Sequence, residues 1–136
     1  MSKKGWRICI DFDGVINSYT SGYKPGDDTF LPDPPVVGTK EFLERCLECF
    51  REVFIVSSRC QTLSGLIAMR EWLKKWDLPD IPISYVKYPA EVYVDDRGWR
   101  FEGTFPDPEI FVEMGTWVKN DEQEKNTKWL KNMNSK

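Results

Sequence analysis

The chain has 136 residues, of which 40% are hydrophobic and 30% are charged; this balance excludes a disordered or fibrous protein and predicts one globular domain. The formal net charge is -3, which argues against non-specific binding to nucleic acid, because such binding needs many Lys and Arg side chains facing phosphates. The sequence contains no histidine, so Ser-His-Asp and Cys-His catalysis and most catalytic zinc sites are excluded. The chemistry left to this chain is that of carboxylates, lysines, hydroxyls and metal ions.

The sequence contains no stretch that approaches the roughly 20 apolar residues of a membrane-spanning helix. Its first residues, Met-Ser-Lys-Lys-Gly-Trp-Arg, lead directly into a strand-like segment and leave no room for the apolar region of a signal peptide. We therefore expect a cytoplasmic protein that does not bind a membrane and whose four cysteines are reduced thiols.

The first half of the chain predicts two strands and one helix, separated by a long excursion. Residues 7–12 form a β-branched apolar run, which is typical of a buried parallel strand. Residues 17–38 are rich in Pro, Gly, Ser and Asp and predict a flap-like excursion. Residues 53–56 predict the second strand. Between the excursion and that strand, Thr39 is a candidate cap for a helix whose apolar stripe consists of Phe42, Cys46, Cys49, Phe50 and Val53.

The second half of the chain continues the alternation of helix and strand. Residues 83–86 and 91–94 predict two further strands, and the chain from residue 118 is polar, as in a surface helix or tail. The alternation predicts an α/β, three-layer Rossmann-like fold with a mainly parallel sheet and helices on both faces, in a domain of residues 1–117 followed by a tail of residues 118–136. The second predicted helix has an apolar stripe of Leu63, Leu66, Met69, Leu73 and Trp76.

Polar residues follow three of the predicted strands at the point where each strand ends. In an open parallel sheet, ligands bind beyond the carboxyl ends of the strands. If the strands are neighbours, four carboxylates converge there, and they raise one another's pKa unless a cation lies among them. A hard divalent ion, above all Mg²⁺, meets that need and takes phosphate oxygens as further ligands, so the pattern predicts metal-assisted chemistry on a phosphorylated substrate. The segments are Asp11-Phe12-Asp13-Gly14, Ser57-Ser58-Arg59 and Asp95-Asp96-Arg97.

Four segments, in order along residues 6–106, resemble the motifs of the haloacid dehalogenase (HAD) superfamily. The run Ile10-Asp11-Phe12-Asp13-Gly14 resembles the first motif, an aspartate pair with one residue between and then glycine. Ser57 resembles the second motif, Lys87 the third, and Asp95-Asp96 the fourth. Passages such as Asp-Asp-Arg and Pro-Asp-Pro-Pro are similar to those of compact phosphatase-like members carried by phages and bacteria.

The resemblance implies a phosphatase with a defined set of acidic residues. Asp11 would attack phosphorus and form an aspartyl-phosphate, and Asp13 would protonate the leaving oxygen and then accept a proton from water. An aspartate at the position of Asp13 is characteristic of the phosphatases and phosphomutases of the superfamily, whereas its dehalogenases have another residue there. The implied Mg²⁺ ligands are Asp11, the backbone carbonyl of Asp13, and Asp95, with Asp96 as a direct or water-mediated ligand.

The resemblance also implies that a hydroxyl and an ammonium group hold the phosphoryl oxygens. Ser57 is the expected hydroxyl, with Ser58 as the alternative. Lys87 is the expected lysine, and Lys74 or Lys75 on the second helix is the alternative.

Several other side chains allow two interpretations each. We expect Arg59 and Arg97 to pair with nearby carboxylates, with substrate binding as the alternative. Cys46 and Cys49 are expected to be core thiols, because no second Cys pair and no histidine completes a zinc site. Three aromatic residues near the C-terminal loop can stack a base, although a satellite hydrophobic cluster is the expected arrangement: Trp99, Phe101 and Phe105.

Larger members of the superfamily carry a cap domain, inserted after the first motif or between the second and third. Neither gap of this chain, residues 17–38 or 59–86, can fold a separate domain, so we expect a capless enzyme. An open site favours a phosphate presented by a larger molecule, such as a nucleic-acid end or a protein, or closure of the site by oligomerisation. The preferred partner is a nucleic-acid end, and a nucleotide is the alternative. The leading prediction is a Mg²⁺-dependent phosphatase. The alternatives are a non-catalytic or regulatory module that binds a phosphorylated partner, and the phosphatase of a nucleic-acid 3′-end-processing system. The substrate and the oligomeric state stay open.

Overall fold

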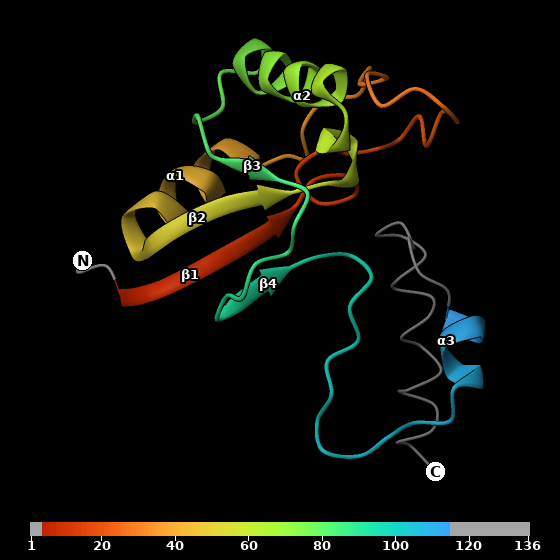
Figure 1. The fold of residues 1–136 in the computed structure, drawn as a ribbon. Helices are drawn as coiled ribbons and strands as arrows, with labels where there is room; N and C mark the ends of the chain where they lie inside the picture. Colours follow the sequence, from red (N-terminus) through yellow and green to blue (C-terminus); the bar gives the residue numbers. More distant parts are fainter. Residues whose placement is uncertain (1–3, 115–136) are drawn as a thin grey trace. The chain divides into compact units, whose positions relative to one another are not determined.

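The unit that ends at Asp95 is built on a four-stranded sheet in which every strand runs parallel (Figure 1). The strands are β1 (Lys4–Asp11), β2 (Phe50–Val56), β3 (Ile83–Ser84) and β4 (Val92–Val94), and they lie in the order β3-β2-β1-β4. All four strands were predicted, although β1 and β2 begin earlier and β3 ends earlier than the sequence pattern indicates. The fold is therefore α/β with a parallel sheet, as the alternation of elements predicts.

Helix α1 (Thr39–Cys49) connects β1 to β2. Its predicted cap is wrong, because Gly38 is the N-cap residue and has a φ of 92°, a left-handed conformation that glycine adopts without strain. Thr39 lies inside the helix, where its hydroxyl donates a hydrogen bond to the Val36 carbonyl at 2.7 Å. Cys46 belongs to the hydrophobic core, as expected, and burial raises the pKa of its thiol. Cys49 is half-buried and lies outside the core cluster, so the prediction that it is a core thiol is wrong.

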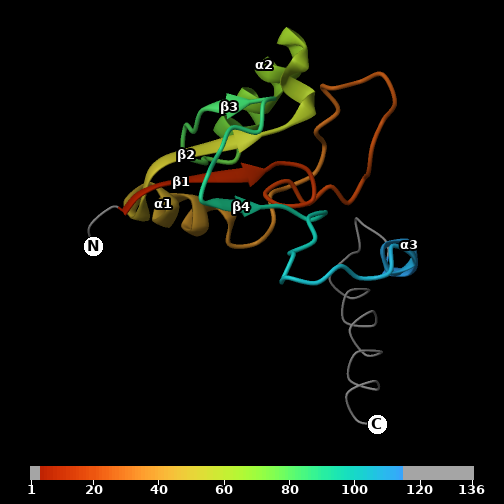
Figure 2. The same cartoon turned by 60° about the horizontal axis from the view of Figure 1, so that its bottom comes forward.

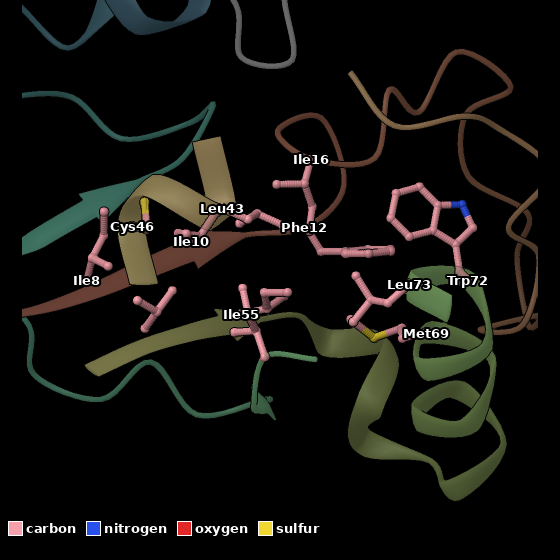
Figure 3. Packing of buried hydrophobic residues seen from close by; sticks show 12 residues of the cluster. Ile8, Ile10, Phe12, Ile16, Leu43, Cys46, Ile55, Met69, Trp72 and Leu73 are labelled. Carbon is pink, nitrogen blue, oxygen red and sulfur yellow. The ribbon is translucent and has the colours of Figure 1, made fainter. Parts of the chain in front are cut away.

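Helix α2 (Leu63–Lys75) connects β2 to β3 and follows a short 3-10 helix, η1 (Ser58–Gln61). The predicted apolar stripe of α2 is displaced at both ends: Leu63 is 72% exposed and Trp76 is 37% exposed, whereas Trp72 is buried. The Trp72 ring packs edge-on against Phe12 with a centroid separation of 5.0 Å (Figure 3). The buried residues of the helix are Gly65, Met69, Trp72 and Leu73.

The hydrophobic core lies on one face of the sheet (Figure 3). Ile8 on β1 pairs with Val53 on β2, and Ile10 pairs with Ile55; these four side chains share that face. Both helices contribute to the same cluster, so the prediction of helices on both faces is wrong for the described part of this unit. The residues added by α1 and α2 are Leu43, Cys46, Met69, Trp72 and Leu73.

The opposite face of the sheet is covered in part by the connection from β3 to β4. This connection, residues 85–91, contains no helix. Tyr88 packs against Phe54 with a ring separation of 6.1 Å, and the Arg7 guanidinium donates to the Pro89 carbonyl at 3.1 Å. A connection between parallel strands that contains a helix needs about a dozen residues or more, and this one is shorter. The second helical layer is therefore missing here, which explains the difference from the predicted three layers.

Residues 18–38 contain no helix or strand and run beyond the carboxyl ends of β1 and β2 (Figure 2). This segment, which we call the excursion, is nevertheless anchored: the Trp72 indole N–H donates to the Asp33 carbonyl at 2.9 Å. The Asp33 carboxylate is buried and accepts hydrogen bonds from Thr20 and Ser21 of the same segment. Burial raises the pKa of Asp33, but the hydrogen bonds from Ser21 and Thr20 outweigh it and hold the pKa below its usual range.

The structure describes residues 4–114 and divides the chain into two units, with the boundary between Asp95 and Asp96. The predicted boundary after residue 117 and the predicted polar segment 118–136 lie outside the described residues. The second unit contains helix α3 (Glu109–Met114), and its aromatic side chains pair with one another: Trp99 with Phe111, and Phe101 with Phe105. Of the helices described, none combines the length and the apolar character that crossing a membrane requires.

Candidate active site

The ends of three neighbouring strands bring the predicted residues to one edge of the sheet. Asp11 is the last residue of β1, and β1 lies between β2 and β4. Asp11 pairs with Val56, the last residue of β2, so Ser57 follows on that side. The register of β1 with β4 places Asp95 on the other side of Asp11. The expectation that these strand ends are neighbours is confirmed.

Asp13 lies in the turn after β1, where two side chains hold its carboxylate. The buried Phe12 fixes the turn in the core, and its carbonyl oxygen accepts hydrogen bonds from the amides of residues 15–17. Arg59 Nε donates to Asp13 Oδ2 at 2.8 Å, and Asn17 Nδ2 donates to Asp13 Oδ1 at 2.8 Å. The orientation of the carboxylate is therefore fixed, while 25% of the side chain stays exposed and open to a ligand.

Of the two partners of Asp13, sequence analysis identifies only Arg59, whose expected pairing with a carboxylate is confirmed. Asn17 was missed because it is the first residue of a segment rich in turn formers. Its side chain is buried and its Oδ1 accepts a hydrogen bond from the Tyr19 amide at 3.3 Å. The signal in the sequence is the spacing: an amide side chain four residues after an aspartate can close the turn between them.

Ser57 and Ser58 occupy different positions at the end of β2. Ser57 is buried, its amide donates to the Ser84 carbonyl of β3 at 3.0 Å, and its Oγ accepts a hydrogen bond from the Arg59 amide at 3.1 Å. Ser58 is exposed on η1. Ser57 is thus the serine held at the strand edge beside Asp11, the position expected for the second motif.

Lys87 lies with the acidic residues at this edge. Its Nζ is 3.5 Å from Asp95 Oδ2 and 4.8 Å from the ring centroid of Tyr93. The alternatives, Lys74 and Lys75, stand in the last turn of α2. Because α2 runs back from the carboxyl end of β2 toward the start of β3, its last turn lies toward the opposite edge of the sheet.

The charged side chains at this edge shift the pKa of a buried thiol, that of Cys9, in opposite directions. Cys9 of β1 is buried, and burial raises the pKa of its thiol. Lys87 opposes that increase, whereas Asp11 and Asp95 add to it. One positive and two negative side chains therefore lie in the neighbourhood of Cys9.

The oxygen atoms at the edge suit a hard cation. Magnesium is commonly held by one or two carboxylates, with waters and substrate oxygens as the other ligands. Asp11 and Asp95, on adjacent strands, supply two carboxylates, and the Asp13 carboxylate is engaged by Arg59 and Asn17, which leaves its main-chain carbonyl for the predicted role. Within residues 4–114, no three His, Cys, Asp or Glu side chains gather around one point that could hold a metal ion, so the predicted convergence of four carboxylates is not found there.

Asp96 and Arg97 belong to the second unit. In the part of the chain that the structure describes, Asp96 Oδ1 is buried without a hydrogen-bond partner. The metal role of Asp96 and the pairing of Arg97 with a carboxylate stay predictions.

A comparison of the chain with family models, curated proteins and solved structures finds no match.

Proposed function

We propose that this chain is a Mg²⁺-dependent phosphatase of the HAD type, which hydrolyses a phosphomonoester through an aspartyl-phosphate on Asp11. The observation that carries the proposal is the shared edge: Asp11, Ser57 and Asp95 follow or end three adjacent parallel strands. That edge is where open α/β sheets bind ligands. The residue types there are a nucleophile, a hydroxyl and a second carboxylate, with the Lys87 ammonium beside them.

The proposed reaction has two steps at phosphorus. In the first, an Asp11 oxygen bonds to phosphorus, the bond from phosphorus to the leaving oxygen breaks, and Asp13 gives its proton to that oxygen. In the second, water gives a proton to Asp13 while its oxygen bonds to phosphorus, which breaks the bond to Asp11 and releases inorganic phosphate. Asp13 serves both steps, so its fixed orientation toward the edge matters twice.

The remaining residues of the edge bind and orient the phosphoryl group. Ser57 and Lys87 would donate to its oxygens as negative charge redistributes over them. Asp11, Asp95 and the Asp13 carbonyl would hold Mg²⁺, which neutralises part of the phosphate charge and thereby lets the Asp11 carboxylate approach an anion.

The absence of a cap within the described part of the first unit supports a large substrate. The excursion contains no helix or strand, and residues 57–82 contain only η1 and α2. Residues 4–95 therefore contain no inserted domain that could enclose this edge of the sheet. We propose that the phosphate is carried by a larger molecule, with a nucleic-acid end as the first candidate, because an open site excludes water poorly from a small free metabolite.

The test is turnover of an aryl phosphate by the purified protein with Mg²⁺, after chelation, and with Mg²⁺ restored. We expect activity that chelation abolishes and Mg²⁺ restores, and that Ca²⁺ supports poorly, because Ca²⁺ prefers more ligands at longer distances. Asp11→Asn should remove turnover. The matched control is Asp80→Asn, since Asp80 is 93% exposed and pairs with Arg70 on the protein surface. Full activity after exhaustive chelation, or in Asp11→Asn, would contradict the proposal.

A module that binds a phosphorylated partner without turnover is the second candidate. The two hydrogen bonds on Asp13 favour it, because a carboxylate held by Arg59 and Asn17 also makes a stable structural turn. A folded protein that binds phosphate-bearing ligands with Mg²⁺, yet turns over none of a panel of nucleotides, phosphopeptides and 3′-phosphorylated oligonucleotides, would select this candidate.

A further inference from the structure

Arg59 connects Asp13 to the excursion. Its side chain is only 7% exposed, and its Nε donates to Asp13 Oδ2 at 2.8 Å. Its Nη1 donates to the carbonyl oxygens of Asp28 and Phe30, both at 3.1 Å. One guanidinium therefore holds the candidate acid-base carboxylate and the middle of the excursion at the same time.

The local backbone is shaped to bring Arg59 to this position. The Arg59 amide donates to Ser57 Oγ, which starts η1, and Thr62 Oγ1 accepts from the Gly65 amide, which starts α2. A Cβ atom on Gly65 would lie 1.9 Å from the Arg59 carbonyl oxygen, so only glycine allows α2 to approach the Arg59 backbone this closely.

The contacts with Arg59 are not what holds the whole excursion in place. Asp33 accepts hydrogen bonds from Thr20 and Ser21 through its carboxylate and from Trp72 through its carbonyl, and these bonds hold the excursion on both sides of residues 28–30. The carbonyls that Arg59 contacts belong to residues 28 and 30, where Thr62 Oγ1 also donates to Asp28 Oδ2 at 3.3 Å. Arginine suits the double task because its planar group directs separate N–H donors toward different acceptors, which a lysine ammonium cannot do in the same geometry.

We propose that Arg59 is a positioning residue that couples the seating of the excursion to the orientation of Asp13. When residues 28–30 are seated, Nη1 is held and Nε presents a fixed donor to Asp13. When they move, the guanidinium is released and Asp13 loses its alignment with the leaving oxygen. A ligand that contacts the excursion thus influences proton transfer at the edge. The proposal rests on the proposed function for the role of Asp13, but the coupling itself is a property of the free protein.

The kinetic test uses the leaving group as a probe of Asp13. A general acid contributes about 100-fold or more with a poor leaving group, and little with an activated aryl phosphate that hardly needs protonation. We expect Arg59→Gln to reduce kcat for an alkyl phosphate about 100-fold, far more than for 4-nitrophenyl phosphate, and to add little in an Asp13→Asn background. Arg59→Lys should recover only part of the loss. Equal losses on both substrates, or losses that add to those of Asp13→Asn, would overturn the coupling.

The matched control is Ser21→Ala, which removes the hydrogen bond from Ser21 Oγ to Asp33 Oδ1 and leaves Trp72, Arg59 and Asp13 unchanged. It loosens the Asp33 contacts of the excursion, so any effect on kcat should be the same for both leaving groups. A leaving-group dependence as large as that of Arg59→Gln would show that general loosening, not Arg59, is responsible.

Hydrogen exchange tests the coupling without turnover. Asp13→Ala should speed amide exchange in residues 27–31 relative to α1, because Arg59 loses the acceptor that holds it. The same substitution in an Arg59→Gln background should have no further effect on residues 27–31. If Asp13→Ala leaves their exchange unchanged while α1 stays protected, the coupling is wrong even if the phosphatase activity is confirmed. If the exchange changes but no phosphoester is hydrolysed, the coupling holds and the proposed function fails. Asp13→Leu, which is close in size to aspartate and has no acceptor for Arg59 Nε, serves if the alanine variant does not fold.

Discussion

The two sides of the candidate site are held in different ways. On one side, the Arg59 side chain is 7% exposed and reaches Asp13 at 2.8 Å, with further bonds to main-chain carbonyls. On the other, the Lys87 side chain is 54% exposed and lies 3.5 Å from Asp95. A buried, multiply bonded pair fixes geometry, whereas an exposed pair contributes little stability and can exchange partners. The Arg59 side thus fixes the position of Asp13, the proposed acid-base group, and in the proposed reaction Lys87 leaves Asp95 for a phosphoryl oxygen.

The largest effect on stability is expected from Arg59→Ala. It leaves the Asp13 carboxylate in a largely buried setting without its charged partner, and breaking such a pair costs about 3 kcal/mol. Chemical denaturation with a two-state analysis gives the free energy of unfolding. A loss as small as that of an exposed ion pair would show that the Arg59 side is not the rigid one.

Gly65→Ala should have the next largest effect. Its new Cβ would meet the Arg59 carbonyl oxygen at 1.9 Å, so the backbone of η1 or α2 must move, at about 1–3 kcal/mol. The matched control is Ser64→Ala, next to it in the first turn of α2, which adds no atoms there. If Gly65→Ala stabilises the protein, as alanine does in an unhindered helix, the close approach is not required.

Asp33→Asn tests the anchor of the excursion and its pH dependence. The buried carboxylate accepts hydrogen bonds from Ser21 and Thr20. In Asp33→Asn the amide N–H group faces these donors and an acceptor is lost, which should lower the free energy of unfolding by about 1–2 kcal/mol. The pKa of Asp33 in the folded state lies below its pKa in the unfolded chain, which is about 3.9. The stabilisation is therefore fully present above that value and is lost as the pH falls through the folded pKa. Asp33→Asn should flatten this acid limb in a plot of unfolding free energy against pH, and an unchanged limb would exclude Asp33 as its source.

Lys87→Met should have the smallest effect on stability and a clear effect on activity. An exposed ion pair contributes less than about 1 kcal/mol, so the unfolding free energy should hardly change. Loss of an ammonium from the phosphoryl group should nevertheless lower kcat/KM by about 100-fold. Lys75→Met is the matched control, since Lys75 lies over the ring of Trp76 as Lys87 lies over that of Tyr93. Equal activity of the two variants would remove Lys87 from the site.

The residues at this edge of the sheet could be predicted from the sequence because each of them directly follows or ends a strand that a local pattern identifies. Asp11, Ser57 and Asp95 each follow an apolar run, and parallel strands end at one edge, so a correct strand assignment is enough to bring them together. Lys87 was expected near these residues from its resemblance to the third motif, and its Nζ lies 3.5 Å from Asp95 Oδ2.

The surroundings of Asp13 depend on contacts that no local pattern contains. Asn17 reaches Asp13 through a turn, and Arg59 reaches the excursion across 29 and 31 positions of sequence. The position of Arg59 in turn depends on Gly65, because a Cβ atom there would collide with the Arg59 carbonyl oxygen. This close approach of α2 to η1 is a tertiary contact that the sequence pattern does not show. The second helical layer was wrongly predicted although the predicted strands, 83–86 and 91–94, leave only residues 87–90 between them, which is too short a connection for a helix.

The most direct test of the central claim is to look for the phosphoryl group on Asp11. The protein is mixed with a labelled phosphomonoester and Mg²⁺, quenched in acid within the first turnovers, and digested for mass spectrometry. The account predicts a phosphorylated peptide that contains Asp11, accumulating most in Asp13→Asn, where water is poorly activated, and absent from Asp11→Asn. Turnover that proceeds at the wild-type rate in Asp11→Asn, or a phosphoryl group on another residue, would contradict it.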